Sequence, residues 1–227
     1  MTGVFLQVRL DSRRLPRKAL LPLEGASLIE RAMGSLVRVP AAVHALLTDS
    51  DSASDLADCA RHSGFEVFTG SKENVLGRFV AAADHYDVDT IVRATGDNPL
   101  VSWQLASMAV RELAVRSLDY FAFDGLPLGA GVEVVRTECL REAAASSNDP
   151  YDLEHVTPYV YRNPERFRCL RAGAPAAYCF SEGRVTVDTE EDYRAICDLV
   201  RGHSDQLPVS ARGLVRWLEN RNNGNAS

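Results

Sequence analysis

The sequence predicts an α/β protein whose central sheet is mostly parallel and covered by helices on both faces. Short apolar runs alternate with segments of helical periodicity along the first half of the chain. These apolar runs are nearly continuous, as expected for strands that are buried on both faces. The 227 residues contain no linker-like stretch, so we expect a single domain over residues 1–227.

The first half of the chain is predicted to contain four strands and four helices. Ser27 and Glu30 have the spacing of a capping box and begin a helix that continues to Leu36. Gly64 is placed to end the second helix. The predicted strands cover residues 4–8, 43–47, 65–68 and 89–93, and the predicted helices cover residues 28–36, 54–62, 75–86 and 102–116.

The second half is less regular. A glycine-containing loop at residues 125–131 lies between two predicted strands. The predicted strands cover residues 119–122, 132–135, 167–171 and 184–187, and the predicted helices cover residues 137–145 and 153–161 and begin again at Glu190 and Ser210. Residues 120–180 form a candidate lobe within the single domain.

The composition excludes several classes of protein. Hydrophobic residues make up 46% and charged residues 25%, which excludes a disordered or fibrous chain. The formal net charge of −6 argues against a chain-wide nucleic-acid-binding surface. No run approaches the ~18 apolar residues of a membrane span, the N-terminus lacks a signal-peptide pattern, and the five cysteines form no CxxC pair. We therefore expect a cytoplasmic protein that binds neither nucleic acid nor membranes.

The loop after the first predicted strand is strongly basic. Five of the ten residues from 9 to 18 are cations: Arg9, Arg13, Arg14, Arg17 and Lys18. Ligands of such sheets bind outside the carboxyl ends of the strands, and clustered cations become favourable around an anion with several charges. Ser12 adds a hydroxyl group, so a triphosphate suits the loop, with a solvated basic surface as the alternative. The patterns GxxxxGK[ST] and GxGxxG are absent, which excludes a Walker P-loop and a dinucleotide fingerprint.

Two aspartates that follow predicted strands are candidate metal ligands. Asp97 lies in a Gly-Asp-x-Pro loop after strand 89–93, and Asp188 directly follows strand 184–187. Two such carboxylates facing a triphosphate suit Mg²⁺, which prefers hard oxygen ligands. The alternatives are a turn aspartate at position 97 and a helix N-cap at position 188. If both residues bind one metal–triphosphate unit, they should lie close together at one edge of the sheet.

A further carboxylate is predicted on an apolar strand. Glu133 begins the run Glu-Val-Val within strand 132–135. Because a buried carboxylate needs a polar partner, we expect Glu133 to meet either the hydroxyl groups of a substrate or a nearby arginine.

Several motifs occur in the order in which one known family carries them. Residues 7–18 read Q-x-R-x-x-S-x-R-L-P-x-K, residues 93–100 read R-x-T-G-D-x-P-L, residues 154–159 read E-H-V-T-P-Y, and residues 184–192 read R-x-T-V-D-T-x-E-D. Together with matching segments at 20–25, 68–79 and 131–134, they make the chain resemble the spore-coat polysaccharide cytidylyltransferases. These are relatives of the synthetases of CMP-activated 3-deoxy-manno-octulosonate (KDO).

The resemblance implies a three-layer α/β/α nucleotidyltransferase fold of the GT-A-like, Rossmann-like type. It implies an enzyme that transfers CMP from CTP to a sugar-like or acidic small-molecule acceptor and releases pyrophosphate, with Mg²⁺ as cofactor. It also implies a homodimer, with residues 120–180 as the lobe for acceptor binding or dimerisation.

The resemblance also assigns roles to individual residues. Nucleotide binding falls to Arg9, Ser12, Arg14, Lys18, Ser71, Arg78 and Asp97, and catalysis to Arg14, Lys18, Asp97 and Asp188. Asp97 and Asp188 would hold the metal, which leaves Thr189 as the cap of the following helix. Acceptor binding falls to Glu133, Glu154 and His155, although the last two could instead pack beside Pro158.

Two departures from the family pattern leave alternatives open. Asp11 and Arg17 stand where the family usually has small residues, and both add charge to the triphosphate loop. They motivate a catalytically inactive nucleotide-binding scaffold as the first alternative. The second is a sugar-phosphate nucleotidyltransferase that uses UTP or GTP, which the absence of a G-G-x-G-x-R loop disfavours. The sequence leaves the acceptor open among an acid sugar, another sugar, a phosphonate and a phosphate.

Overall fold

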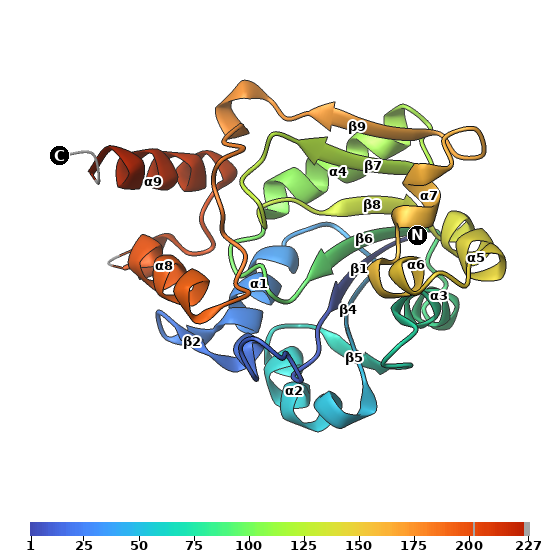
Figure 1. The fold of residues 1–227 in the computed structure, drawn as a ribbon, viewed down its shortest axis with the longest axis horizontal. Helices are drawn as coiled ribbons and strands as arrows, with labels where there is room; N and C mark the ends of the chain where they lie inside the picture. Colours follow the sequence, from blue (N-terminus) through green and yellow to red (C-terminus); the bar gives the residue numbers. More distant parts are fainter. Residues whose placement is uncertain (202, 225–227) are drawn as a thin grey trace.

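A seven-stranded sheet forms the centre of the computed structural model, which describes residues 1–201 and 203–224. Neighbouring strands follow the order β5-β4-β1-β6-β8-β7-β9 (Figure 1). The strands are β1 (Thr2–Gln7), β4 (Val43–Thr48), β5 (Glu66–Thr69), β6 (Thr90–Thr95), β7 (Tyr120–Asp124), β8 (Glu133–Arg136) and β9 (Cys169–Gly173). Only β8 runs against its neighbours β6 and β7, so the predicted mostly parallel sheet is confirmed.

Helices cover the two faces of the sheet in separate layers, as predicted. On one face, buried residues of three helices pack against β1, β4, β6 and β8: α1 (Leu28–Leu36), α2 (Ser50–His62) and α4 (Trp103–Val115). The opposite face is covered by α3 (Val75–His85), α5 (Thr137–Ser146), α6 (Pro150–His155) and α7 (Pro158–Arg162). Near-continuous apolar strands are explained by this burial from both sides.

The C-terminal helices form a third apolar cluster. α8 (Glu190–Val200) and α9 (Ala211–Gly224) pack with Leu100, Val185, Val187 and the short hairpin of β2 (Pro22–Leu23) and β3 (Ala26–Ser27). Figure 1 shows these helices beyond the sheet, on the side to which the arrows of β6, β7 and β9 point. The carboxyl ends of the parallel strands therefore face the C-terminal part of the chain.

Helix starts follow the capping chemistry of the sequence. The Ser27–Glu30 capping box is present at α1, and Thr189 caps α8 together with Asp192, as predicted. α2 begins at Ser50 instead of residue 54 because the Asp49 side chain accepts a hydrogen bond from Ser52 N at 2.9 Å.

The helix predicted over residues 153–161 is wrong, because the segment is two short helices, α6 and α7. They are separated at Val156, whose φ of 74° and ψ of −56° lie outside the helical region. Thr157 N donates to His155 O at 2.9 Å, which closes a γ-turn of the strained, positive-φ type. Pro158 lacks an N–H donor, so it cannot continue the hydrogen-bond ladder of α6, but it is well suited to the first turn of α7, where it stands.

The strand predicted over residues 184–187 is also wrong. The segment is extended but forms only an isolated bridge, from Arg184 to Leu128. Its valines are fully buried, but they pack into the cluster of α8 and α9 and not into the sheet. The apolar run therefore correctly indicated burial, but the backbone N–H groups of the segment donate to loops instead of a neighbouring strand.

No helix in the described part of the chain is long and apolar enough to cross a membrane.

Candidate functional site

The basic loop after β1 is fixed by the backbone of Leu10, which is buried. Leu10 N donates to Ser52 Oγ at 3.1 Å, and Leu10 O accepts from Arg17 N at 3.0 Å. Ser52 is itself held by the Asp49 carboxylate at the start of α2. The loop therefore folds over the carboxyl end of β4 and turns back toward β6.

Lys18 brings the two predicted carboxylates together. Its Nζ lies 3.1 Å from Asp188 Oδ1 and 3.5 Å from Asp97 Oδ2, and it donates to Val187 O at 2.6 Å. Asp97 Oδ2 and Asp188 Oδ1 therefore both lie within 3.5 Å of the same Lys18 Nζ atom. Val187 N also donates to Asp97 O at 2.8 Å, so the backbones of both aspartate segments touch. This agrees with the expectation that both residues lie at one edge of the sheet, while their role as metal ligands stays a prediction.

Asp188 is surrounded by cations. Besides Lys18, Arg14 lies 3.1 Å from Oδ1, and Arg184 donates to Oδ2 at 2.9 Å. Burial alone would raise the pKa of Asp188, but the hydrogen bond from Lys18 and the charges of Lys18 and Arg14 outweigh it and hold the pKa below its ordinary value. Asp188 is therefore a carboxylate at neutral pH.

The oxygen atoms of the Asp97 loop suit a hard cation. Asp97 Oδ1 and Asn98 Oδ1 are buried and accept no hydrogen bond from any residue that the structure describes. Gly96 lets this loop approach closely, because a Cβ there would lie 2.8 Å from Val8 Cβ. Within residues 1–201 and 203–224, no group of three or more His, Cys, Asp or Glu side chains is arranged to hold a metal. The residues present thus fit Mg²⁺ bound by one or two carboxylates with other oxygen ligands, as on phosphates.

The charges at Asp11 and Arg17 are both paired. Arg17 Nη1 lies 2.7 Å from Asp55 on α2, so its guanidinium points to that helix. Lys72, in the loop between β5 and α3, lies 2.7 Å from Asp11 and holds its pKa below the ordinary value. The sequence did not single out Lys72, because nothing in the chain near position 11 indicates its partner.

Ser71 and Arg78 lie together at the start of α3. Arg78 Nη1 donates to Ser71 O at 2.9 Å, and Ser71 Oγ accepts from Asn74 N at 3.0 Å. Burial lowers the pKa of Arg78, and its Nε has no hydrogen-bond partner among the described residues. Gly70 is required beneath it, because a Cβ there would lie 2.9 Å from Arg78 Cγ. A buried guanidinium with an unused donor is a candidate for contact with a ligand.

Ser12 and Arg9 lie in the same basic loop and are held less tightly than Lys18. Ser12 is half-buried, and Arg9 is an exposed residue whose side chain lies 3.5 Å from both Asp11 and Glu154. Glu154 comes from α6, so this contact connects the basic loop with the E-H-V-T-P-Y segment.

Glu133 meets a nearby arginine, which was one of the two expected partners. Arg93 Nη1 donates to Glu133 Oε2, Tyr120 OH donates to Oε1 at 2.6 Å, and Thr157 Oγ1 lies within 3.0 Å of both oxygens. Burial, with the Glu133 charge, raises the pKa of Tyr120 well above its ordinary value, so Tyr120 stays a donor. Gln7 extends the network by accepting from Arg93 Nε at 3.1 Å. A role for Glu133 in binding the acceptor substrate stays a prediction.

His155 is exposed and packs against Tyr151 with tilted rings, at a ring-centroid distance of 4.3 Å. Of the residues that sequence reasoning missed, Thr157, Arg93 and Gln7 lie inside motifs that the sequence already singled out. Tyr120 carried no signal, because an aromatic residue on an apolar strand is typical of a core.

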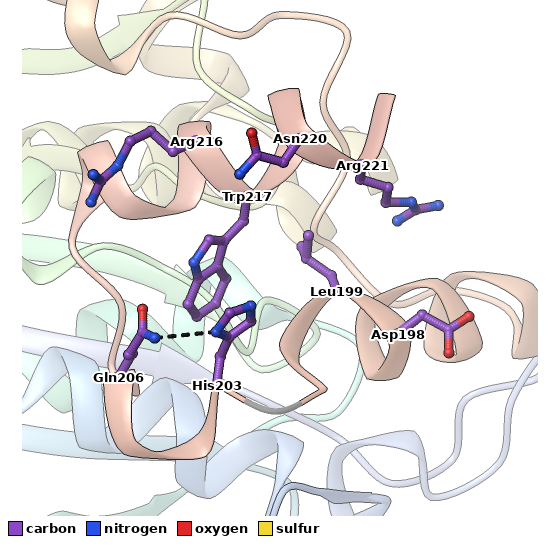
Figure 2. Close-up of a pocket in the computed structure, with 8 residues that line it drawn as sticks. All are labelled: Asp198, Leu199, His203, Gln206, Arg216, Trp217, Asn220 and Arg221. Carbon is purple, nitrogen blue, oxygen red and sulfur yellow. Dashed lines mark hydrogen bonds between the residues drawn. The ribbon is translucent and has the colours of Figure 1, made fainter. Parts of the chain in front are cut away.

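A separate cavity of about 570 Å³ lies between α8, α9 and the 3₁₀ turn Ser204–Gln206. Figure 2 shows the Trp217 and His203 rings stacked at its wall, with a centroid distance of 4.5 Å. None of the predicted site residues lines this cavity.

Clustered cations lie beside two carboxylates at the carboxyl edge of a mostly parallel sheet, an arrangement that suits nucleotide phosphates. With this fold, they place the protein among the nucleotidyltransferases. The chain matches the model of the cytidylyltransferase family over residues 4–213, and it belongs to that family.

Individual relatives agree with this assignment. The chain is 34% identical to the spore coat polysaccharide biosynthesis protein SpsF of Bacillus subtilis, over 96% of this chain and 93% of that protein. A cytidylyltransferase from Leptospira borgpetersenii has a similar structure, with a TM-score of 0.87, 25% identity, and coverage of 99% of this chain and 95% of that one. A CMP:2-keto-3-deoxy-manno-octonic acid synthetase solved with CTP shares the fold at a TM-score of 0.68 and 14% identity, covering 89% of this chain and 99% of that one. The predicted resemblance and the nucleotidyltransferase fold are therefore confirmed.

Proposed function

We propose that this protein transfers CMP from CTP to an oxygen nucleophile of a sugar-like or acidic acceptor, releases pyrophosphate and depends on Mg²⁺. The observation that carries the proposal is the contact of Lys18 with both Asp97 and Asp188, beside Arg14. The family membership and a relative whose structure holds CTP support the choice of nucleotide.

The cations of the loop bind the triphosphate in this proposal. Arg14 and Lys18 contact carboxylates in the structure, and these charge-assisted contacts are the kind that phosphate oxygens replace. The acceptor oxygen forms a bond to the α-phosphorus, and the bond from that phosphorus to the pyrophosphate oxygen breaks. Mg²⁺ held by Asp97 and Asp188 would neutralise charge on the phosphates. The chain's own part is positioning and charge neutralisation, which carry most of the catalysis in phosphoryl-type transfers.

Ser12, Ser71 and Arg78 are proposed to complete the nucleotide site, since the last two are joined by a hydrogen bond where the chain passes from β5 to α3. The acceptor is proposed to bind near Glu133, Glu154 and His155. The Arg9–Glu154 contact supports this placement, because it brings the acceptor side next to the nucleotide loop. We further propose that the protein acts in the cytoplasm, in polysaccharide biosynthesis like the SpsF relative, and as a homodimer built through residues 120–180.

The test is a thermal-shift comparison of CTP, UTP, GTP and ATP, each with and without Mg²⁺. A ligand at a hundredfold excess over its Kd stabilises the folded state by about 2.7 kcal/mol. In a chain of this length that corresponds to a rise in Tm of about 5–10 °C. We expect this rise for CTP with Mg²⁺ in the native protein, and its loss in Asp97→Asn. Equal shifts with all four nucleotides would contradict the choice of CTP, and no shift with any of them would contradict the triphosphate site.

A further inference from the structure

We infer that Arg184 and Asp192 are positioning residues that hold the Asp188 carboxylate in the direction in which it serves the site. The inference deepens the proposed function and rests on it, because it explains how one of the two proposed metal ligands is presented.

Asp188 lacks the support that a strand would give. The extended segment before it forms an isolated bridge at Arg184, and its amide groups donate to loops, Val185 N to Leu128 O and Val187 N to Asp97 O, each at 2.8 Å. A residue at the end of a paired strand is oriented by ladder hydrogen bonds, whereas Asp188 lies past the last of these contacts. Holding its side chain in one rotamer costs conformational entropy, which other contacts must offset.

The Arg184–Asp192 pair supplies those contacts to both the side chain and the backbone. Arg184 Nη2 donates to Asp188 Oδ2 at 2.9 Å, and Arg184 Nε donates to Asp192 Oδ1 at 2.8 Å. The other oxygen, Asp192 Oδ2, accepts from the backbone N–H of Asp188 at 2.9 Å. Asp188 is thus enclosed by two residues that also bind each other.

The two carboxylate oxygens of Asp188 contact different partners in this arrangement. Oδ2 is occupied by Arg184, which is anchored to α8 through Asp192. Oδ1 faces Lys18 and Arg14, the two cations that the proposed function assigns to phosphate. When those cations contact phosphates, Oδ1 becomes available to a metal, while Arg184 keeps the carboxylate from rotating.

Asp192 also belongs to the capping box of α8, where its Oδ2 accepts from Thr189 N at 2.9 Å. A purely structural role in that cap is the competing explanation. Asp192→Asn separates the two, because an asparagine oxygen at the position of Oδ2 still accepts from the backbone N–H groups, whereas its NH₂ group replaces Oδ1. The variant thereby loses the 2.8 Å hydrogen bond from Arg184 Nε and keeps only the longer contact of 3.3 Å between Arg184 Nη2 and Oδ2.

The experiment measures the Mn²⁺ concentration that gives half of the CTP-induced thermal shift, together with Mn²⁺ binding by electron paramagnetic resonance. Groups that orient a metal's ligands typically change metal affinity 10–100-fold when they are removed. We therefore expect Asp192→Asn and Arg184→Gln each to raise the required Mn²⁺ concentration about tenfold, and Arg184→Lys to restore part of it. Arg194→Gln is the matched control, because Arg194 pairs with Glu190 on the exposed face of the same helix and should behave like the native protein.

Two outcomes are decisive. Native Mn²⁺ requirements in Asp192→Asn and Arg184→Gln, with a raised requirement in Asp188→Asn, would overturn the inference and leave the proposed function intact. A native protein that shows no metal-dependent response to CTP would overturn the proposed function and the inference with it. If Arg184→Gln fails to fold, Asp192→Asn and Arg184→Lys decide, because both retain an amide or ammonium group of similar size.

Discussion

Replacing Lys18 with methionine removes an ammonium group that contacts both Asp97 and Asp188. The Lys18 side chain is only 14% exposed, and its Nζ also donates to Val187 O. A hydrogen bond to a charged group contributes about 1.5–3 kcal/mol, and a buried polar group left without a partner adds a further cost. Because Asp188 keeps Arg14 and Arg184, we expect Lys18→Met to lower the free energy of unfolding by about 2–3 kcal/mol, which is a fall in Tm of about 5–10 °C.

The same variant should respond to divalent cations. In the native protein the Lys18 ammonium contacts both carboxylates, and a divalent cation must compete with it. In Lys18→Met that competitor is gone, so millimolar Mg²⁺ should recover part of the lost Tm, while Lys18→Met/Asp97→Asn should recover less. Thermal unfolding of the native protein and both variants, with and without Mg²⁺ and without nucleotide, measures this directly.

Lys72→Met is the matched control. Lys72 also forms a close ion pair, but the pair with Asp11 is about two-fifths exposed. Exposed pairs contribute about 0–1 kcal/mol, so this variant should lose little Tm and gain no response to Mg²⁺. The reasoning is refuted if Lys18→Met unfolds at the native temperature, or if Mg²⁺ shifts it no more than it shifts Lys72→Met.

Three further outcomes are expected. Arg14→Ala should weaken CTP binding by about 1.5–3 kcal/mol in isothermal calorimetry, whereas Arg13→Ala should change it little, because Arg13 is exposed and forms no ion pair within the described residues; the opposite order would show that the loop is misassigned. Gly96→Ala should lower the free energy of unfolding by about 1–3 kcal/mol in urea titration, since its Cβ would lie 2.8 Å from Val8 Cβ; an unchanged midpoint would contradict the close approach. The Arg184 hydrogen bond holds the pKa of Asp192 in the folded protein below its unfolded value of 3.8, so the ionised Asp192 stabilises the fold above pH 3.8, and this stabilisation is lost as the pH falls below that value. In acid titration, the free energy of unfolding of Asp192→Asn should therefore fall less steeply below pH 4 than that of the native protein.

The fold was predictable because each layer leaves a local pattern in the chain. Buried parallel strands appear as apolar runs, and Ser27 with Glu30 marks the start of α1. The two wrong elements share a cause, since both were inferred from apolar spacing alone. Val185 and Val187 are buried by α8 and α9, and Val156 is buried at a γ-turn, so their apolar character reports burial without reporting backbone conformation.

The candidate site was predictable where its charged groups lie within one loop, and less so where their partners come from distant segments of the chain. Asp97 and Asp188 were singled out, yet the contact through Lys18 joins residues 170 positions apart in the chain. Lys72 and Tyr120 were missed because their roles exist only through Asp11 and Glu133, which lie on other elements. Charge and spacing in the sequence identify candidate functional residues, whereas the ion-pair and hydrogen-bond partners of those residues depend on the order of strands in the sheet.

This difference bears on the alternative of an inactive scaffold. Counted along the chain, the five cations of the basic loop include the added Arg17, and Asp11 adds one carboxylate. In space, Arg17 is neutralised by Asp55 and Asp11 by Lys72, so neither added charge is left unbalanced beside Arg14 and Lys18. These two departures from the family pattern therefore supply no electrostatic reason for lost activity, and the cations and carboxylates on which the proposed phosphate chemistry depends contact one another.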